Sequence, residues 1–154
     1  MDNELHFRRA AIGDLPAIIA MLADDILGSA REKSEDPLPE CYLKAFILMQ
    51  ADPHQELTVV EMNNEIVGTF QLNFVQCLSY QGGRRAMIEA VRTHSAYRGQ
   101  GIGEKVMTWA INRAKEKGCH LLQLTADKQR PDAKRFYESL GFTASHEGMK
   151  LKLG

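Results

Sequence analysis

The sequence lacks a long apolar run and has no excess of either charge. No stretch of 18 consecutive apolar residues occurs, which excludes a membrane-spanning helix. The 19 lysines and arginines balance 20 aspartates and glutamates, and the formal net charge is −1. Nucleic-acid-binding domains usually carry a clearly basic face. The acidic start, Met1–Glu4, does not resemble a signal peptide. We therefore expect a cytoplasmic protein with neither a membrane nor a nucleic acid as a partner.

Cysteine is scarce and scattered. The three cysteines, Cys41, Cys77 and Cys119, form no Cys-x-x-Cys pair, a pattern typical of reduced, buried thiols in a reducing compartment. The five histidines show no metal-ligand spacing. We therefore expect neither disulfides nor a bound metal.

The length and composition suit one globular domain. The chain has 154 residues, and 44% of them are apolar. A chain of this size buries roughly two-thirds of the surface of its unfolded form, which is enough for a core without cross-links. No repeat, linker or low-complexity tract divides the chain. We expect a single domain over residues 1–154.

Hydrophobic periodicity predicts alternating strands and helices. Strands are predicted at 4–9, 57–62, 65–74, 86–93, 121–125 and 149–153. Helices are predicted at 14–28, 40–50, 101–117 and 131–140. Asp14 is the expected cap of the first helix and Gly28 its expected end. The pair Asn63-Asn64 predicts a tight hairpin turn, and residues 76–85 a loop. The order β-α-α-β-β-β-α-β-α-β predicts an α/β fold built on one mixed sheet.

A glycine-rich turn, Arg98-Gly99-Gln100-Gly101-Ile102-Gly103, joins a predicted strand to the longest predicted helix. Glycine allows the backbone to approach a ligand closely, and the free amides at a helix start favour an anion. The P-loop string is absent, and Val106 stands where a dinucleotide fingerprint needs its third glycine. Taken alone, the turn predicts either an anion site or merely a structural connection.

Two motifs resemble the GNAT superfamily of N-acetyltransferases. Arg98-x-x-Gly101-x-Gly103 matches the family's Arg/Gln-x-x-Gly-x-Gly/Ala motif, and the preceding run, residues 88–99, is similar to the family's central strand. Residues 132–142 are similar to the family's second motif, and the element order is also the family's. One position departs from the pattern. Many members carry an asparagine that contacts the cofactor where this chain has Arg130, so that contact is not inferred.

The resemblance implies a GNAT-like fold, in which helices flank a central mixed, mostly antiparallel sheet. It also implies acetyl-CoA as co-substrate and direct transfer of the acetyl group to a primary amine of a small molecule or peptide, in a ternary complex. The backbone at Val91 and Thr93 would pair with the pantetheine and hold the oxyanion. The resemblance also implies a possible homodimer, because members of the family form homodimers, although no feature of this sequence shows one. The implied diphosphate-binding residues are Arg98, Gly99, Gln100, Gly101, Ile102 and Gly103.

Tyr137, in the second motif, is the general acid that the resemblance implies. A tyrosine hydroxyl, with a pKa of about 10, can protonate a leaving thiolate. The alternative is a tyrosine that only packs on the sheet beside Phe136. Arg130, Lys134 and Arg135 would meet the 3′-phosphate of the cofactor or form a solvated basic face.

Glu89 is the first candidate for the general base. Strand alternation predicts that it shares a face with Val91 and Thr93. The alternative is a structural ion pair with Arg84, Arg85 or Arg92. His94, or a chain of water molecules, is the other candidate base.

The sequence therefore predicts an acetyl-CoA-dependent N-acetyltransferase. The alternative is a non-catalytic protein that binds acyl-CoA and regulates a partner. We expect the two N-terminal helices and residues 76–85 to form the acceptor pocket, but they carry no motif that identifies the amine.

Overall fold

A computed structural model describes residues 4–154, so the first residues of the acidic start lie outside the described part. The described chain forms two compact units, one that ends at Gln123 and one that spans Leu124–Gly154. The first unit contains the whole sheet, and the second contains one helix.

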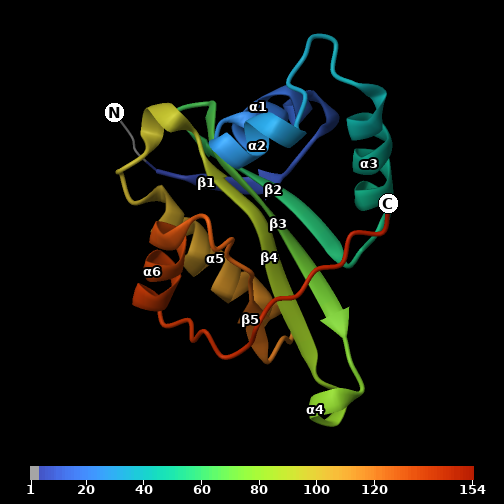
Figure 1. Cartoon of the computed structure of the whole chain (residues 1–154), viewed down its shortest axis with the longest axis vertical. Helices are drawn as coiled ribbons and strands as arrows, with labels where there is room; N and C mark the ends of the chain where they lie inside the picture. The colour runs from blue at the N-terminus through green and yellow to red at the C-terminus, as the bar shows by residue number, and fades with distance from the viewer. Residues whose placement is uncertain (1–3) are drawn as a thin grey trace. The chain divides into compact units, whose positions relative to one another are not determined.

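The first unit is built on one five-stranded mixed sheet (Figure 1). The strands lie in the order of the chain, and the first four pair antiparallel, whereas the last pairs parallel to its neighbour. This confirms the predicted mixed α/β fold class. The strands are β1 (His6–Arg9), β2 (Gln55–Met62), β3 (Glu65–Gln76), β4 (Arg84–Thr93) and β5 (Leu121–Gln123).

Helix α5 (Ile102–Glu116) packs on one face of this sheet. Its apolar stripe was predicted from periodicity, and Val106, Met107 and Ala110 are at most 1% exposed. Trp109 stacks on Phe7 of β1, with ring centroids 5.1 Å apart, and meets Phe70 of β3 edge-on at 5.6 Å. Large aromatic contacts of this kind hold the helix against the centre of the sheet.

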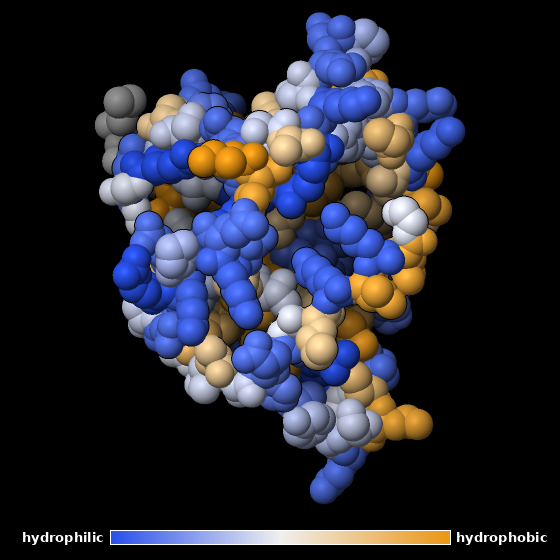
Figure 2. Space-filling model, in the orientation of Figure 1, coloured by the Kyte–Doolittle hydropathy of each residue, from blue (hydrophilic) through white to orange (hydrophobic). Residues whose placement is uncertain are grey.

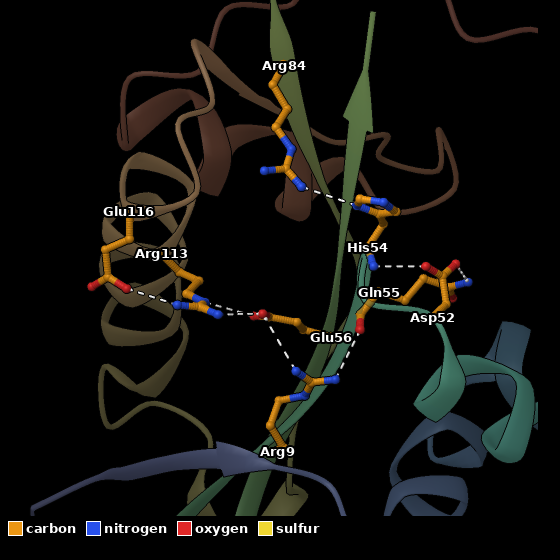
Figure 3. Close-up of polar contacts among 8 residues, drawn as sticks. All are labelled: Arg9, Asp52, His54, Gln55, Glu56, Arg84, Arg113 and Glu116. Carbon is orange, nitrogen blue, oxygen red and sulfur yellow. Dashed lines mark hydrogen bonds and ion pairs between the residues drawn. The ribbon is translucent and has the colours of Figure 1, made fainter.

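A buried ion pair fixes the C-terminal half of α5 (Figure 3). Glu56 of β2 has a side chain that is only 3% exposed, and it accepts two hydrogen bonds from Arg113, at 2.9 and 2.6 Å. Arg9 adds a charge 3.6 Å away. Burial raises the pKa of Glu56, but the hydrogen bonds and charge of Arg113, with Arg9 and Lys117 adding positive charge, outweigh it and leave that pKa below its ordinary value of 4.5.

Three helices cover the opposite face: α1 (Leu15–Ala23), α2 (Ile26–Arg31) and α3 (Glu40–Ala51). The helical conformation is interrupted at Asp24-Asp25. A separate helix, α2, begins there because the Asp25 side chain accepts a hydrogen bond from the amide of Gly28. The prediction that one helix ends at Gly28 is therefore wrong. Gly28 lies inside α2, where a Cβ would overlap the carbonyl oxygen of Leu22.

Asp14 does not cap α1 as predicted. Its carboxylate instead accepts a hydrogen bond from the amide of Ala11, across the short 3-10 turn η1 (Ile12–Asp14), and two from Arg8. The hydrogen bonds from Arg8 lower the pKa of Asp14 below its ordinary value of 3.8. The side chain thus joins β1 to the turn before α1 rather than to the helix.

The predicted hairpin at Asn63-Asn64 is confirmed, because both residues have positive φ angles, 52° and 64°. The predicted loop at 76–85 is shorter than expected. It contains a single turn, α4 (Ser79–Gly82), in which Tyr80 and Gln81 are left-handed. Most of the face drawn in Figure 2 is hydrophilic, and apolar residues appear there in separate groups.

The second unit contains the predicted helix near its start, α6 (Pro131–Ser139). The strand predicted at 149–153 is wrong, since the described residues after α6 form no strand. A strand needs a neighbouring strand for its backbone hydrogen bonds, and alternation alone does not supply one.

Candidate active site

Strand β4 has an open edge over half of its length. Strand β5 pairs only with Arg85, Ala86 and Met87 of β4. Within the described sheet, no strand pairs with this edge from Ile88 to Thr93. This edge can therefore receive an extended ligand that adds to the sheet as a strand would, with the Val91 carbonyl already accepting a hydrogen bond from Arg92 Nη1 at 2.9 Å. Val91 and Thr93, the predicted pantetheine-binding positions, lie on this segment.

A β-bulge interrupts the same segment. Ala90 has a left-handed φ of 52°, and the register with β3 shifts: Gln71 lies opposite Glu89, but Thr69 lies opposite Arg92. The prediction that Glu89 shares a face with Val91 and Thr93 is therefore wrong, because the extra residue reverses the alternation. An alanine gives no sequence signal for this conformation, which costs about 1–2 kcal/mol and is characteristic of functional sites.

Glu89 is held by a hydrogen bond rather than by an ion pair. Asn73 Nδ2 of β3 donates to Glu89 Oε2 at 3.1 Å. In residues 4–154, no arginine or lysine nitrogen lies within 4.0 Å of this carboxylate. Of the three arginines that were alternative partners, Arg84 donates to the Lys117 carbonyl at 3.0 Å and contacts His54 (Figure 3), and Arg92 lies 3.8 Å from Asp25.

Asn73 ends a row of hydrogen-bonded amides that the sequence did not reveal. Gln71 Nε2 donates to Asn73 Oδ1 at 2.8 Å and to Gln55 Oε1 at 3.2 Å. Gln55 Nε2 in turn donates to Asp52 at 2.9 Å, as Figure 3 shows. The carboxylates at the two ends accept only, so they fix the orientation of every amide between them. We call Gln55, Gln71 and Asn73 the amide row.

The glycine-rich turn has the geometry expected of an anion site. Gly99 and Gly101 have φ angles of 79° and 77°, and α5 begins directly after them. The first helical hydrogen bond joins the amide of Lys105 to the carbonyl of Gly101, at 3.2 Å. The amides of the first helical turn before Lys105 therefore have no helical acceptor and point out of the helix start.

His94 and Arg98 make contacts in the segment that leads from β4 into the glycine-rich turn. His94 Nδ1 accepts a hydrogen bond from the amide of Ala96 at 3.1 Å and so caps the 3-10 turn η2 (Ser95–Tyr97). Arg98 lies 3.7 Å from the carboxylate of Asp24. Asp24 and Asp25, at the break between α1 and α2, thus bind the arginines that flank the end of β4.

Tyr137 lies on α6 in the second unit. Its ring is tilted against that of Phe136, with centroids 5.4 Å apart, and meets Phe142 edge-on at 5.9 Å. Arg130, Lys134 and Arg135, which were expected either to meet the 3′-phosphate or to form a solvated basic face, line an open hollow of about 360 Å³. Arg135 also pairs with Asp132 of the same helix.

No group of three or more His, Cys, Asp or Glu side chains is placed to hold a metal ion among residues 4–154. No helix in this part of the chain is long and apolar enough to cross a membrane.

Comparisons with known proteins agree with this architecture. The family model for the acetyltransferase (GNAT) family matches residues 20–142. A solved structure described as a transcriptional regulator from Bacillus halodurans C-125 is 57% identical, with a TM-score of 0.94 over 97% of this chain and 100% of the other.

Two curated enzymes are also similar. The aminoalkylphosphonate N-acetyltransferase of Salmonella typhimurium is 28% identical over 70% of this chain and 69% of its own length. The glucosamine 6-phosphate N-acetyltransferase of Trypanosoma brucei brucei is 36% identical over 57% of this chain and 58% of its own length. The family match covers most of the chain and includes both the glycine-rich turn and α6. The chain therefore belongs to the GNAT family of acetyltransferases, which use acetyl-CoA as the acyl donor.

Proposed function

We propose that this protein is an N-acetyltransferase that moves the acetyl group of acetyl-CoA to a primary amine by direct attack in a ternary complex. The observation that carries the proposal is the open edge of β4, which runs from Ile88 to Thr93 and leads into the glycine-rich turn. The open strand edge is followed directly by an anion site. A single ligand with a pantetheine arm that ends in a diphosphate fits this arrangement.

The cofactor would be bound mainly by backbone groups. The amides of the turn Arg98–Gly103 would hold the diphosphate, and the backbone of Val91 and Thr93 would pair with the pantetheine. The bulge at Ala90 breaks the regular pairing of β4 with β3 beside the proposed thioester position. Amide donors fixed in such a position stabilise the oxyanion that forms when the amine attacks.

Glu89 would accept the proton of the attacking amine. An alkylamine with a pKa of about 10.4 is neutral in roughly one molecule in a thousand at pH 7, so a base or a water chain is needed. Asn73 holds the carboxylate in one orientation on the face of β4. Tyr137 would donate its hydroxyl proton to the CoA thiolate as the carbon–sulfur bond breaks. We propose that residues 1–154 act as one acetyltransferase domain, because the family match over residues 20–142 includes both the glycine-rich turn and the second motif.

The similar enzymes support a small-molecule acceptor. By their names, they act on an aminoalkylphosphonate and on glucosamine 6-phosphate. Both are small primary amines, and we favour such an acceptor over a peptide.

The test is release of free thiol from acetyl-CoA with a panel of primary amines. We expect Tyr137→Phe to lower kcat about 100-fold, the usual contribution of a general acid. Tyr97→Phe, which removes a tyrosine hydroxyl that donates a hydrogen bond to Glu65, is the matched control and should leave kcat unchanged. Equal rates for Tyr137→Phe and the wild type across the pH range would remove Tyr137 from this role.

A second candidate function is regulation by acyl-CoA without catalysis. It is favoured by the 57% identical structure that is described as a transcriptional regulator. Such a protein would bind acetyl-CoA, release no thiol with any amine, and be indifferent to Tyr137→Phe. The net charge of −1 indicates that it would act through a protein partner rather than by binding DNA directly.

A further inference from the structure

The two faces of the central strands differ in how completely they are covered. On the α5 side, Leu72 of β3 and Ala86 and Ile88 of β4 are at most 2% exposed. On the other side, the amide row, Arg85 and Met87 are only half-buried, and Glu89 is exposed. Helices α1 to α3 therefore leave part of this face accessible, and most side chains named in the accessible part are polar. A half-open polar floor beside the reacting groups is suited to binding a hydrophilic molecule.

Arg85 lies on the same face as Glu89, at the other end of this floor. The register places Val75 opposite Arg85, Asn73 opposite Met87 and Gln71 opposite Glu89, so the alternation is regular over this stretch. The bulge begins only after Glu89. At a rise of about 3.3 Å per residue, the Cα atoms of Arg85 and Glu89 lie roughly 13 Å apart.

The charge of Arg85 has no counter-ion in the described structure. No carboxylate of residues 4–154 lies within 4.0 Å of its guanidinium. Its Nε is buried and has no hydrogen-bond partner among these residues. A partly desolvated cation without a partner costs free energy, which an anionic ligand would recover. The neighbouring Arg84 differs, because its guanidinium is bound to the Lys117 carbonyl and lies over the ring of Phe74.

We infer that the acceptor is a primary amine that also carries an anionic group, either a carboxylate or a phosphate-like group. Its amine lies at Glu89, its anionic group binds Arg85, and Asn73 and Met87 contact the atoms between them. Arg85 is thus a specificity-determining residue. The inference rests on the proposed acetyltransferase function. The cofactor would approach from the glycine-rich turn after Thr93, which leaves the N-terminal half of β4 to the acceptor.

Matched acceptor pairs test the inference. Each pair holds the amine constant and removes the anionic group: 2-aminoethylphosphonate and ethanolamine, glucosamine 6-phosphate and glucosamine, and an amino acid and its amide. The first two pairs test phosphate-like groups and the third tests a carboxylate. We expect the anionic member of at least one pair to have the higher kcat/KM in the wild type.

Substitution of Arg85 connects this preference to the residue. Arg85→Gln should raise the KM of the anionic acceptor about 10- to 100-fold, as loss of a charge-assisted hydrogen bond does, and leave the KM of acetyl-CoA and the rate with the uncharged acceptor unchanged. Arg85→Lys should restore part of the preference. Arg84→Gln removes the same charge one position away, on the opposite face, and should not alter the preference. Thermal unfolding of each variant checks that it folds.

Two outcomes would overturn the inference: no preference for the anionic member in any pair, or an Arg85→Gln variant that loses activity equally with both members of a pair. Failure of the proposed function looks different, since no amine would then release thiol. In that case, thermal unfolding of the CoA-bound protein with and without an anionic amine tests the Arg85 site. Stabilisation of the wild type by an anionic amine, but not of Arg85→Gln, would still support the site, and no stabilisation would refute it.

Discussion

Asn73 contacts Glu89 across two strands, and this one hydrogen bond gives the candidate base its orientation. We predict that Asn73→Ala lowers kcat about 10- to 100-fold, because a misoriented catalytic group loses much of its effect, and leaves the KM of acetyl-CoA unchanged. A double-mutant cycle checks the cause. In the Glu89→Gln background, the Asn73 substitution should have almost no further effect on kcat, since it acts through Glu89. If the two losses multiply instead, Asn73 acts independently of Glu89.

At the residue scale, the sequence identified candidate catalytic residues but did not predict which side chains they contact. Glu89 was identified because a carboxylate in the middle of a strand is unusual. Its neighbours could not be identified, because contacts across strands depend on register, and here the register shifts at Ala90. Asn73 and Arg85 carry no local pattern that separates them from ordinary strand residues. Their role becomes visible only when β3 and β4 are paired.

A substitution at Gly101 tests the role of the glycine-rich turn, which joins β4 to α5. We predict that Gly101→Ala weakens acetyl-CoA binding about tenfold, measured by calorimetry, because it strains the turn and places a methyl group at the proposed diphosphate site. A Cβ at this position meets no other atom within 4 Å, so the cost to stability comes from the φ of 77° and should be about 1 kcal/mol.

Gly118, after the other end of α5, provides the matched control. Its φ is 73°, and a Cβ there also meets nothing within 4 Å. Gly118→Ala should therefore cost similar stability and leave acetyl-CoA binding unchanged. Equal affinities for the two alanine variants would show that the turn does not contact the cofactor.

At the element scale, strong local patterns were predictive and weak ones were not. The stripe of α5 and the asparagine pair of the β2–β3 hairpin depend on nearby residues only, and both were predicted correctly. The break between α1 and α2 depends on the hydrogen bond that the amide of Gly28 donates to the Asp25 side chain. Hydrophobic periodicity carries no information about such a bond. The alternation at 149–153 is as clear as that of a strand, yet a strand forms only where a partner strand is available.

The buried pair of Glu56 and Arg113 makes the stability of the whole first unit depend on pH. Because the folded pKa of Glu56 lies below its ordinary value of 4.5, the pair stabilises the protein above about pH 5 and loses this contribution as the pH falls and Glu56 becomes protonated. We predict that Arg113→Ala costs about 3 kcal/mol at pH 7, because it leaves a buried carboxylate without its main partner. The cost should shrink as the pH falls below 4.5 and the carboxyl group becomes protonated, because a neutral carboxyl group tolerates burial without the arginine.

Urea unfolding monitored by Trp109 measures this directly, since the chain has one tryptophan and its half-buried ring packs against Phe7 and Phe70 of the sheet. Lys44→Ala is the control. It breaks an ion pair with Glu40 whose side chains are 71% and 77% exposed, and it should cost less than about 0.5 kcal/mol at either pH. If Arg113→Ala cost as much at pH 4 as at pH 7, its packing rather than its charge would be what joins α5, and with it the glycine-rich turn, to the sheet.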